Sequence, residues 1–76
     1  MNQRLTQVLC DVLDLDPARV GPDLMREEVD QWDSLNHLKV VTAVEEAFDL
    51  KLTMQEIESV DGIARLIDLL EAHDRL

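Results

Sequence analysis

The sequence predicts an all-α domain that spans residues 1–76 and contains three longer helices and one short helix. Three segments repeat apolar residues at helical spacing, and no segment alternates apolar and polar residues as a strand does. The chain is also too short to divide into several domains. Hydrophobic residues make up 46% of the chain and charged residues 32%, which is typical of a globular protein rather than a disordered one.

The first predicted helix runs from about Asn2 to Leu15. Its apolar face has the i, i+3, i+4, i+7, i+8 spacing of an amphipathic helix and consists of Leu5, Val8, Leu9, Val12 and Leu13. Pro17 disfavours helical geometry at Asp16, so we expect the helix to end before this pair. Cys10 lies away from the apolar face, and we interpret it as a bystander thiol rather than a reactive one.

Residues 16–33 form a long connection without a helical period. A connection of this length is uncommon in a small domain and usually has a function. Its apolar residues, which can anchor it across the helix ends, are Val20, Leu24, Met25, Val29 and Trp32. We expect a packed connector with one helical turn, in which Trp32 closes the loop over the bundle.

The second predicted helix begins at Asp33 or Ser34, either of which can cap a helix, and continues to about Phe48. Projected at about 100° per residue, its core face consists of Val40, Val41, Val44 and Phe48, with His37 and Ala47 close by. Leu35 and Leu38 fall outside this face, in a group that also holds Ser34, Lys39, Thr42, Glu45 and Glu46. This group is either a docking strip for a partner or a set of exposed residues without a function.

The last two predicted helices follow a break after the second one. Residues 53–56, Thr-Met-Gln-Glu, match a capping box, and only a short helix carrying Ile57 fits before Ser59. We expect Ser59 to cap the final helix. The apolar face of that helix consists of Ile63, Leu66, Ile67 and Leu70.

Composition excludes several classes of function. Seventeen acidic and seven basic residues give a net charge of −10, which repels nucleic acids and anionic membranes and favours partners with basic patches. No apolar run approaches the roughly 18–20 residues that cross a bilayer, so we expect no membrane insertion. A single cysteine excludes an internal disulfide and a cysteine-based zinc site. We therefore expect a cytoplasmic monomer without a metal site.

Ser34 stands where a helix start exposes free backbone N–H groups and the positive end of the helix dipole. A phosphate ester on its hydroxyl would be held favourably by these groups. The simpler interpretation is that Ser34 or Asp33 is only a helix cap. No pair of acid and base residues at credible spacing accompanies it, so we expect no catalysis by the chain itself.

The triplet Asp33-Ser34-Leu35 opens the second helix about midway along this acidic helical chain, and residues 40–48 end in Glu-Glu-Ala-Phe. Leu52-Thr53 and the later apolar residues Ile57, Val60, Ile63, Leu66 and Ile67 continue the pattern. Over its whole length the sequence resembles the acyl carrier proteins. The resemblance implies a four-helix bundle in which a phosphopantetheinyl transferase attaches 4′-phosphopantetheine from coenzyme A to Ser34. The thiol of this arm would then hold acyl groups as thioesters and carry them to partner enzymes.

The resemblance also implies where partners bind. Acyl-loading and acyl-transferring enzymes would dock basic patches on the second helix, over Leu35, Leu38, Thr42, Glu45 and Glu46. Asp33 and Leu35, which flank Ser34, would form the cofactor-binding site with it. Five apolar residues would either line an interior that receives a short acyl chain or form plain core: Val40, Val44, Phe48, Ile57 and Ile63. We favour plain core, because apolar periodicity normally reflects packing.

Departures from the family pattern point to discrete carriers of specialised or polyketide-like pathways. Gln31 and Trp32 replace the glycine and small residue common before the triplet, and Asn36, His37 and Lys39 replace acidic residues after it. We interpret His37 as a packed histidine. The alternative for the whole chain is an unmodified acidic adaptor that binds a basic protein through Leu35, Leu38 and Glu45. Such an adaptor should tolerate Ser34→Ala with a capping loss of about 1 kcal/mol.

Overall fold

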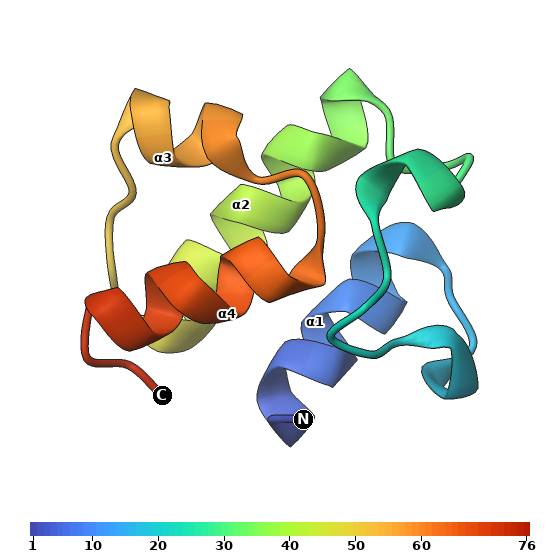
Figure 1. Ribbon diagram of the computed structural model, residues 1–76, viewed down its shortest axis with the longest axis horizontal. Coiled ribbons are helices and arrows are strands. Elements are labelled where there is room, and N and C mark those ends of the chain that lie inside the picture. The colour runs from blue at the N-terminus through green and yellow to red at the C-terminus, as the bar shows by residue number, and fades with distance from the viewer.

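The computed structural model describes residues 1–76 and contains only helices and connections (Figure 1). The four α-helices are α1 (Gln3–Leu13), α2 (Ser34–Phe48), α3 (Met54–Ser59) and α4 (Ile63–Ala72). Two short 3-10 turns, η1 (Pro17–Arg19) and η2 (Arg26–Glu28), interrupt the long connector. The predicted all-α fold with three longer helices and one short helix is confirmed. None of these helices combines the length and the apolar character that a membrane span requires.

Helix α1 ends earlier than the sequence suggested. The backbone of Asp14 turns into the left-handed region, with φ of 53°, and its N–H bonds the carbonyl of Cys10. The N–H of Leu15 bonds the same carbonyl at 3.2 Å, and the Leu15 side chain is buried. The reversal at Asp14 therefore ends the helix two residues before Asp16, and the predicted end at Leu15 was wrong.

The connector between α1 and α2 contains two helical turns instead of the single one expected. Asp16 caps the first turn by accepting the N–H of Ala18 at 2.9 Å, and Glu28 closes the second by accepting the N–H of Met25 at 2.9 Å. The two turns form through these side-chain bonds and lack a periodic apolar face, so a prediction based on apolar spacing did not find both of them. The anchoring of the connector is confirmed, since Val29 and Trp32 are buried.

Helix α4 begins at Ile63, and Ser59 does not cap it. The N–H of Ile63 bonds the carbonyl of Leu24 in the connector at 3.0 Å, and this long-range main-chain bond fixes the start of the helix. Met25 and Gly62 form an isolated antiparallel bridge at the same place. A Cβ at Gly62 would lie 3.0 Å from the Leu24 carbonyl oxygen, so this close approach favours glycine. The cap prediction for Ser59 was wrong.

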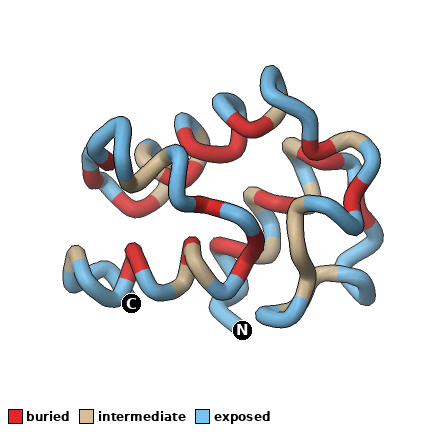
Figure 2. Tube along the Cα trace, turned by 45° about the horizontal axis from the view of Figure 1, so that its top comes forward, coloured by how far each residue is buried: buried red, intermediate tan, exposed pale blue.

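One core joins α1, α2, α4 and the connectors, with their buried residues turned inward (Figure 2). From the helices it takes Leu5, Leu9, Leu13, Val40, Val41, Val44, Phe48, Ile63, Leu66, Leu69 and Leu70. Helix α3 contributes no fully buried side chain and only packs Ile57 partly against the core. It therefore lies on the outside of the bundle, along the end of α2 that carries Ser34 (Figure 1).

Candidate functional site

Ser34 is the first residue of α2, and Asp33 is its cap. The Asp33 carboxylate accepts the backbone N–H of Asn36 at 2.9 Å. The Ser34 side chain is exposed, and its hydroxyl forms no hydrogen bond to any other residue of the chain. Because Asp33 supplies the cap, the hydroxyl of Ser34 is free to react with a molecule from solvent.

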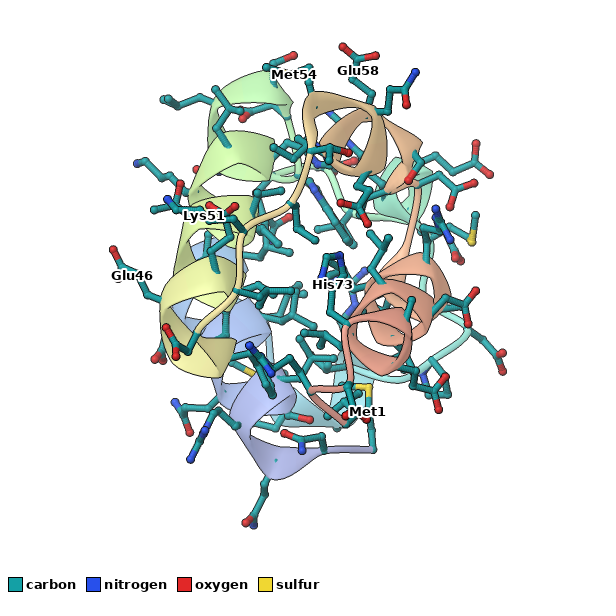
Figure 3. All side chains as sticks on the ribbon, turned by 90° about the vertical axis from the view of Figure 1, so that its left-hand side faces the viewer. Met1, Glu46, Lys51, Met54, Glu58 and His73 are labelled. Carbon is teal, nitrogen blue, oxygen red and sulfur yellow. The ribbon has the colours of Figure 1, made fainter.

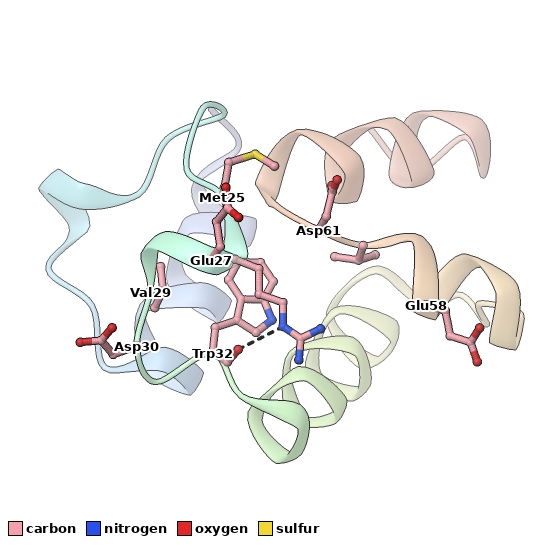
Figure 4. A pocket seen from close by; sticks show the side chains of 9 residues that line it. Met25, Glu27, Val29, Asp30, Trp32, Glu58 and Asp61 are labelled. Carbon is pink, nitrogen blue, oxygen red and sulfur yellow. Dashed lines mark hydrogen bonds between the residues drawn. The ribbon is translucent and has the colours of Figure 1, made fainter.

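Side chains fix the backbone that leads into Ser34. Asn36 donates its amide to the carbonyl of Gln31 at 2.7 Å, and Gln31 donates its own amide to the carbonyl of Leu13 at 2.8 Å. From η2, the Nε of Arg26 donates to the carbonyl of Trp32 at 3.0 Å (Figure 4). The loop before Ser34 is therefore bonded to α1, to η2 and to the first turn of α2.

His37 is buried and fully bonded. The Nε1–H of Trp32 donates to His37 Nδ1 at 3.0 Å, and His37 Nε2 lies 2.9 Å from the carbonyl oxygen of Ile57. Since Nδ1 accepts, the ring proton must be on Nε2 for both bonds to form. Neither ring nitrogen is left to act as a base toward Ser34, which confirms His37 as a packed histidine. His37 is therefore not the neighbouring base that would activate Ser34 as a catalytic serine.

A surface groove of about 320 Å³ begins at Ser34 and runs between α2 and α3. It is lined by Arg26, Ser34, His37, Leu38, Met54, Ile57 and Glu58. Met54 and Glu58 stand on the outer side of α3 (Figure 3). The groove offers a cation, Arg26, an anion, Glu58, and an apolar wall next to a free hydroxyl. Arg26 and the apolar wall fit an arm joined through a phosphate.

Sequence reasoning missed three of these lining residues. Arg26 belongs to the aperiodic connector, where no pattern predicts which side chain reaches the helix start. Glu58 follows no periodic signal either. For Met54 there was a signal, because it is an apolar residue directly after the Thr53 cap of a short helix. At that position few core contacts are within reach, so an exposed side chain could have been expected. Its side chain is in fact 67% exposed.

The exposed strip of α2 agrees in part with the predicted docking residues. Leu35 and Leu38 are 64% and 55% exposed. They share a shallow hollow with other residues of α2, namely Lys39, Thr42, Ala43 and Glu46. Glu45 differs, because its carboxylate accepts the backbone N–H of Leu52 at 2.8 Å and is half-buried. Partner binding by these residues stays a prediction.

The five interior residues pack as plain core would. Val40, Val44, Phe48 and Ile63 are buried, and no surface hollow reaches them. Ile57 is the exception, since it is half-buried and faces the groove beside Ser34. An arm that lay in the groove would therefore meet Ile57 before any other member of this set.

Cys10 has the surroundings of an unreactive thiol. Partial burial raises its pKa, and the nearby carboxylates of Asp11 and Asp16 raise it further. The thiol therefore stays protonated at neutral pH, and its fixed place on α1 keeps it away from the groove. This agrees with the interpretation of Cys10 as a bystander.

Comparison with known proteins identifies the family of the chain. The family model described as "Phosphopantetheine attachment site" matches residues 3–70, a segment that contains Ser34. The chain is similar to the acyl carrier protein of Rubrobacter xylanophilus, at 25% identity over 71 residues that cover 93% of this chain and 88% of that protein. It is also similar to the acyl carrier protein of Thermosynechococcus vestitus, at 25% identity over 68 residues that cover 90% and 84% of the two chains.

The acyl carrier protein of Buchnera aphidicola is a third relative, at 22% identity over 71 residues that cover 93% of this chain and 89% of that protein. The family match spans α1 to α3 and most of α4, so it describes the fold as well as the motif. Membership implies a covalently attached 4′-phosphopantetheine as the prosthetic group. The chain belongs to the phosphopantetheine attachment-site family that includes the acyl carrier proteins.

Proposed function

We propose that Ser34 is the residue that carries 4′-phosphopantetheine, and that the chain shuttles acyl groups as thioesters between partner enzymes. The contrast between the two serines of the chain supports this most directly. Ser34 has a free, exposed hydroxyl at the start of α2. The hydroxyl of Ser59 donates to the carbonyl of Glu56 at 2.6 Å and accepts from Arg65 Nε at 3.0 Å. Only Ser34 can react without first breaking bonds within the chain.

In the attachment step, the Ser34 oxygen attacks the phosphorus of coenzyme A that bears the pantetheine. A new phosphorus–oxygen bond forms as the bond to adenosine 3′,5′-bisphosphate breaks, and this nucleotide leaves. The hydroxyl proton passes to a base of the transferase, because no side chain of this protein accepts a hydrogen bond from the Ser34 hydroxyl. Asp33 and the bonded loop hold the helix start in place, so the hydroxyl meets the transferase in one orientation. Once attached, the group supplies the terminal thiol that forms the thioester.

Partners of the loaded chain would dock on the exposed strip of α2. Leu35 and Leu38 offer an apolar centre, and Glu46 offers a negative charge at its edge. Lys39 places a cation within the same hollow. A partner that fits this strip needs an apolar centre with a basic group opposite Glu46 and an acceptor opposite Lys39, which differs from a surface suited to a wholly acidic helix. This difference supports partners from a specialised, polyketide-like pathway.

The test is the intact mass of the chain after incubation with coenzyme A, Mg²⁺ and a broad-specificity phosphopantetheinyl transferase. The parent chain should gain the mass of one phosphopantetheinyl group. Ser34→Ala should gain nothing, whereas the matched variant Ser59→Ala should be modified like the parent. An established carrier protein in the same mixture shows that the transferase is active.

Modification of Ser34→Ala would place the attachment elsewhere and overturn the assignment. A folded parent chain that gains no mass, beside a modified control carrier, would favour the unmodified adaptor. The adaptor would then be tested by binding to a basic protein, with Leu38→Ala expected to weaken that binding.

A further inference from the structure

We propose that neutral His37 is a latch that holds α3 beside Ser34, and that a proton taken up by His37 opens this latch. The groove beside Ser34 lies between α2 and α3, so its width depends on what fixes α3. Any consequence for an arm on Ser34 rests on the proposed function. The latch itself is a property of the unmodified chain.

The latch is a chain of two hydrogen bonds through one imidazole ring. Trp32 donates Nε1–H to His37 Nδ1 over 3.0 Å, and His37 donates Nε2–H to the Ile57 carbonyl over 2.9 Å. Trp32 and His37 are both buried, with exposed fractions of 3% and 7%. These two hydrogen bonds thereby join the loop before Ser34, the helix that carries Ser34 and the opposite wall of the groove.

Only the neutral ring can form both bonds. Protonation puts a second hydrogen on Nδ1, which then points at the N–H of Trp32 across 3.0 Å. Two donors facing one another in a buried place leave both without an acceptor, and such a loss is costly. One of the two buried side chains must therefore shift when His37 takes up a proton, so the ring that donates to Ile57 is no longer fixed on its Trp32 side.

Few other contacts oppose the release of α3. The helix has six residues and buries no side chain completely. Its other side-chain links to the bundle are the partial packing of Ile57 against the core, the bond from Arg65 to Ser59, and the pair of His73 with Glu56, in which the two atoms are 2.8 Å apart. Protonation of His73 would strengthen its pair with Glu56. The two histidines therefore act in opposite directions on α3 as the pH falls.

The charged groups around His37 have opposite signs. Arg26 of η2 and Glu58 of α3 line the same groove as His37, and Asp33 stands one turn before it on its own helix. Arg26 disfavours a positive ring, and the two carboxylates favour one. The carboxylates of Glu58 and Asp33 are exposed, so solvent screens them. The bond from buried Trp32 is thus the contact that depends most directly on the protonation of the ring.

The experiment uses the unmodified full chain at about pH 7.5 and about pH 5.5, on either side of the range in which histidine titrates. Trp32 is the only tryptophan, so its fluorescence reports this place alone. The matched variant is His37→Gln, whose amide can accept from Trp32 and donate to Ile57 but cannot take up a proton. His73→Gln removes the second histidine.

We expect the emission of Trp32 to change in the parent chain as the pH falls, because protonation of His37 removes the acceptor of the indole N–H. We expect its folded-to-unfolded ratio to fall more than that of His37→Gln between the two pH values, by up to about tenfold, because the unfolded chain binds the proton without losing the Trp32 bond. The pH dependence that the carboxylates contribute is the same in both proteins and therefore cancels in this comparison. His73→Gln should retain both changes.

Equal pH dependence in the parent and in His37→Gln would overturn the proposal, and so would a change that disappears only in His73→Gln. If His37→Gln fails to fold, ¹⁵N-resolved NMR of the parent imidazole decides instead. We expect a proton on Nε2 at about pH 7.5, and amide shifts of residues 54–59 that move together with the titration of His37. A proton on Nδ1 at neutral pH would exclude the latch. None of these readouts requires modification of Ser34.

Discussion

Two regions of the bundle are held together by different physics. Helices α1 and α2 meet through buried aliphatic side chains, among them Leu5, Leu9 and Val44, each with none of its surface exposed. Helix α3 buries no side chain fully and is joined to its neighbours by the polar contacts of His37, His73 and Arg65. Apolar burial hardly depends on pH, whereas each of these contacts depends on charge or on a proton.

The difference shows how a small domain can hold the helix that carries a reactive residue rigidly while a neighbouring helix stays free to move. Ser34 begins α2, which the apolar core fixes, and its preceding loop is bonded to α1 and η2. The far wall of the groove next to Ser34 is α3. Because α3 buries no side chain fully, it can move while exposing little apolar surface. The predictions below separate these two properties.

The largest effect is expected from Leu9→Ala, which removes a fully buried side chain of α1. A leucine-to-alanine change in a close-packed core costs about 3 kcal/mol. That loss is a large part of the stability of a domain this small. Urea unfolding followed by circular dichroism should show a lower midpoint with an unchanged slope.

Met54→Ala is the matched change on α3, since Met54 is 67% exposed. Its free energy of unfolding should change by about 0.5 kcal/mol or less, as for other surface substitutions. Similar losses of unfolding free energy in Leu9→Ala and Met54→Ala would contradict the division between a buried pair of helices, α1 and α2, and an outer helix, α3.

The next effect concerns the contact between the rigid region and the wall. Trp32→Phe keeps an aromatic ring in the loop but removes the donor to His37 Nδ1. Loss of one buried hydrogen bond should cost about 1–2 kcal/mol in unfolding experiments. Modification of Ser34 by the transferase should continue, because we interpret Trp32 as closing the loop. A variant of unchanged stability that is no longer modified would instead make Trp32 a residue of the docking surface.

Sequence reasoning predicted well those elements whose apolar pattern is regular. The face of α1, the bounds of α2 and the capping box of α3 follow from periodicity and from local side-chain chemistry, and all are confirmed. At the start of α4 it was wrong because distant main-chain groups decide. The start of α4 depends on a bond from Ile63 to Leu24, which are 39 positions apart in the chain (63 − 24), and no local pattern announces that pair.

The candidate site divides in the same way. Asp33, Ser34, Leu35 and Leu38 were predicted because a helix start and a 3.6-residue period are local features. Their exposure and the capping role of Asp33 agree with that prediction. The partners of His37 were not predicted, since they come from a loop without a period and from a carbonyl of another helix. Arg26 escaped for the same reason.

A smaller effect is expected at the start of α3. The Thr53 hydroxyl accepts the N–H of Glu56 at 3.1 Å, and Thr53→Ala removes this cap at a cost of about 1 kcal/mol. Because α3 is an outer wall, hydrogen exchange should rise at the amides of residues 54–59 and stay unchanged in α1. Equal increases in both helices would mean that α3 unfolds only together with the whole bundle.

The smallest effect is expected from the charge of Glu56. Hydrogen bonds from the N–H of Thr53 and from His73 lower the pKa of this carboxyl below its ordinary value of 4.5. A lowered pKa in the folded chain stabilises the fold above the unfolded value and ceases to do so as the pH falls through the folded one. Between about pH 5 and about pH 3, the urea midpoint of the parent should therefore fall slightly more than that of Glu56→Gln. The effect should be smaller than that of Thr53→Ala, because the pair with His73 is partly exposed and glutamine can still accept from Thr53. Parallel curves for the two chains would mean that the charge of Glu56 does not hold α3, and that the outer wall depends on His37 and Arg65 alone.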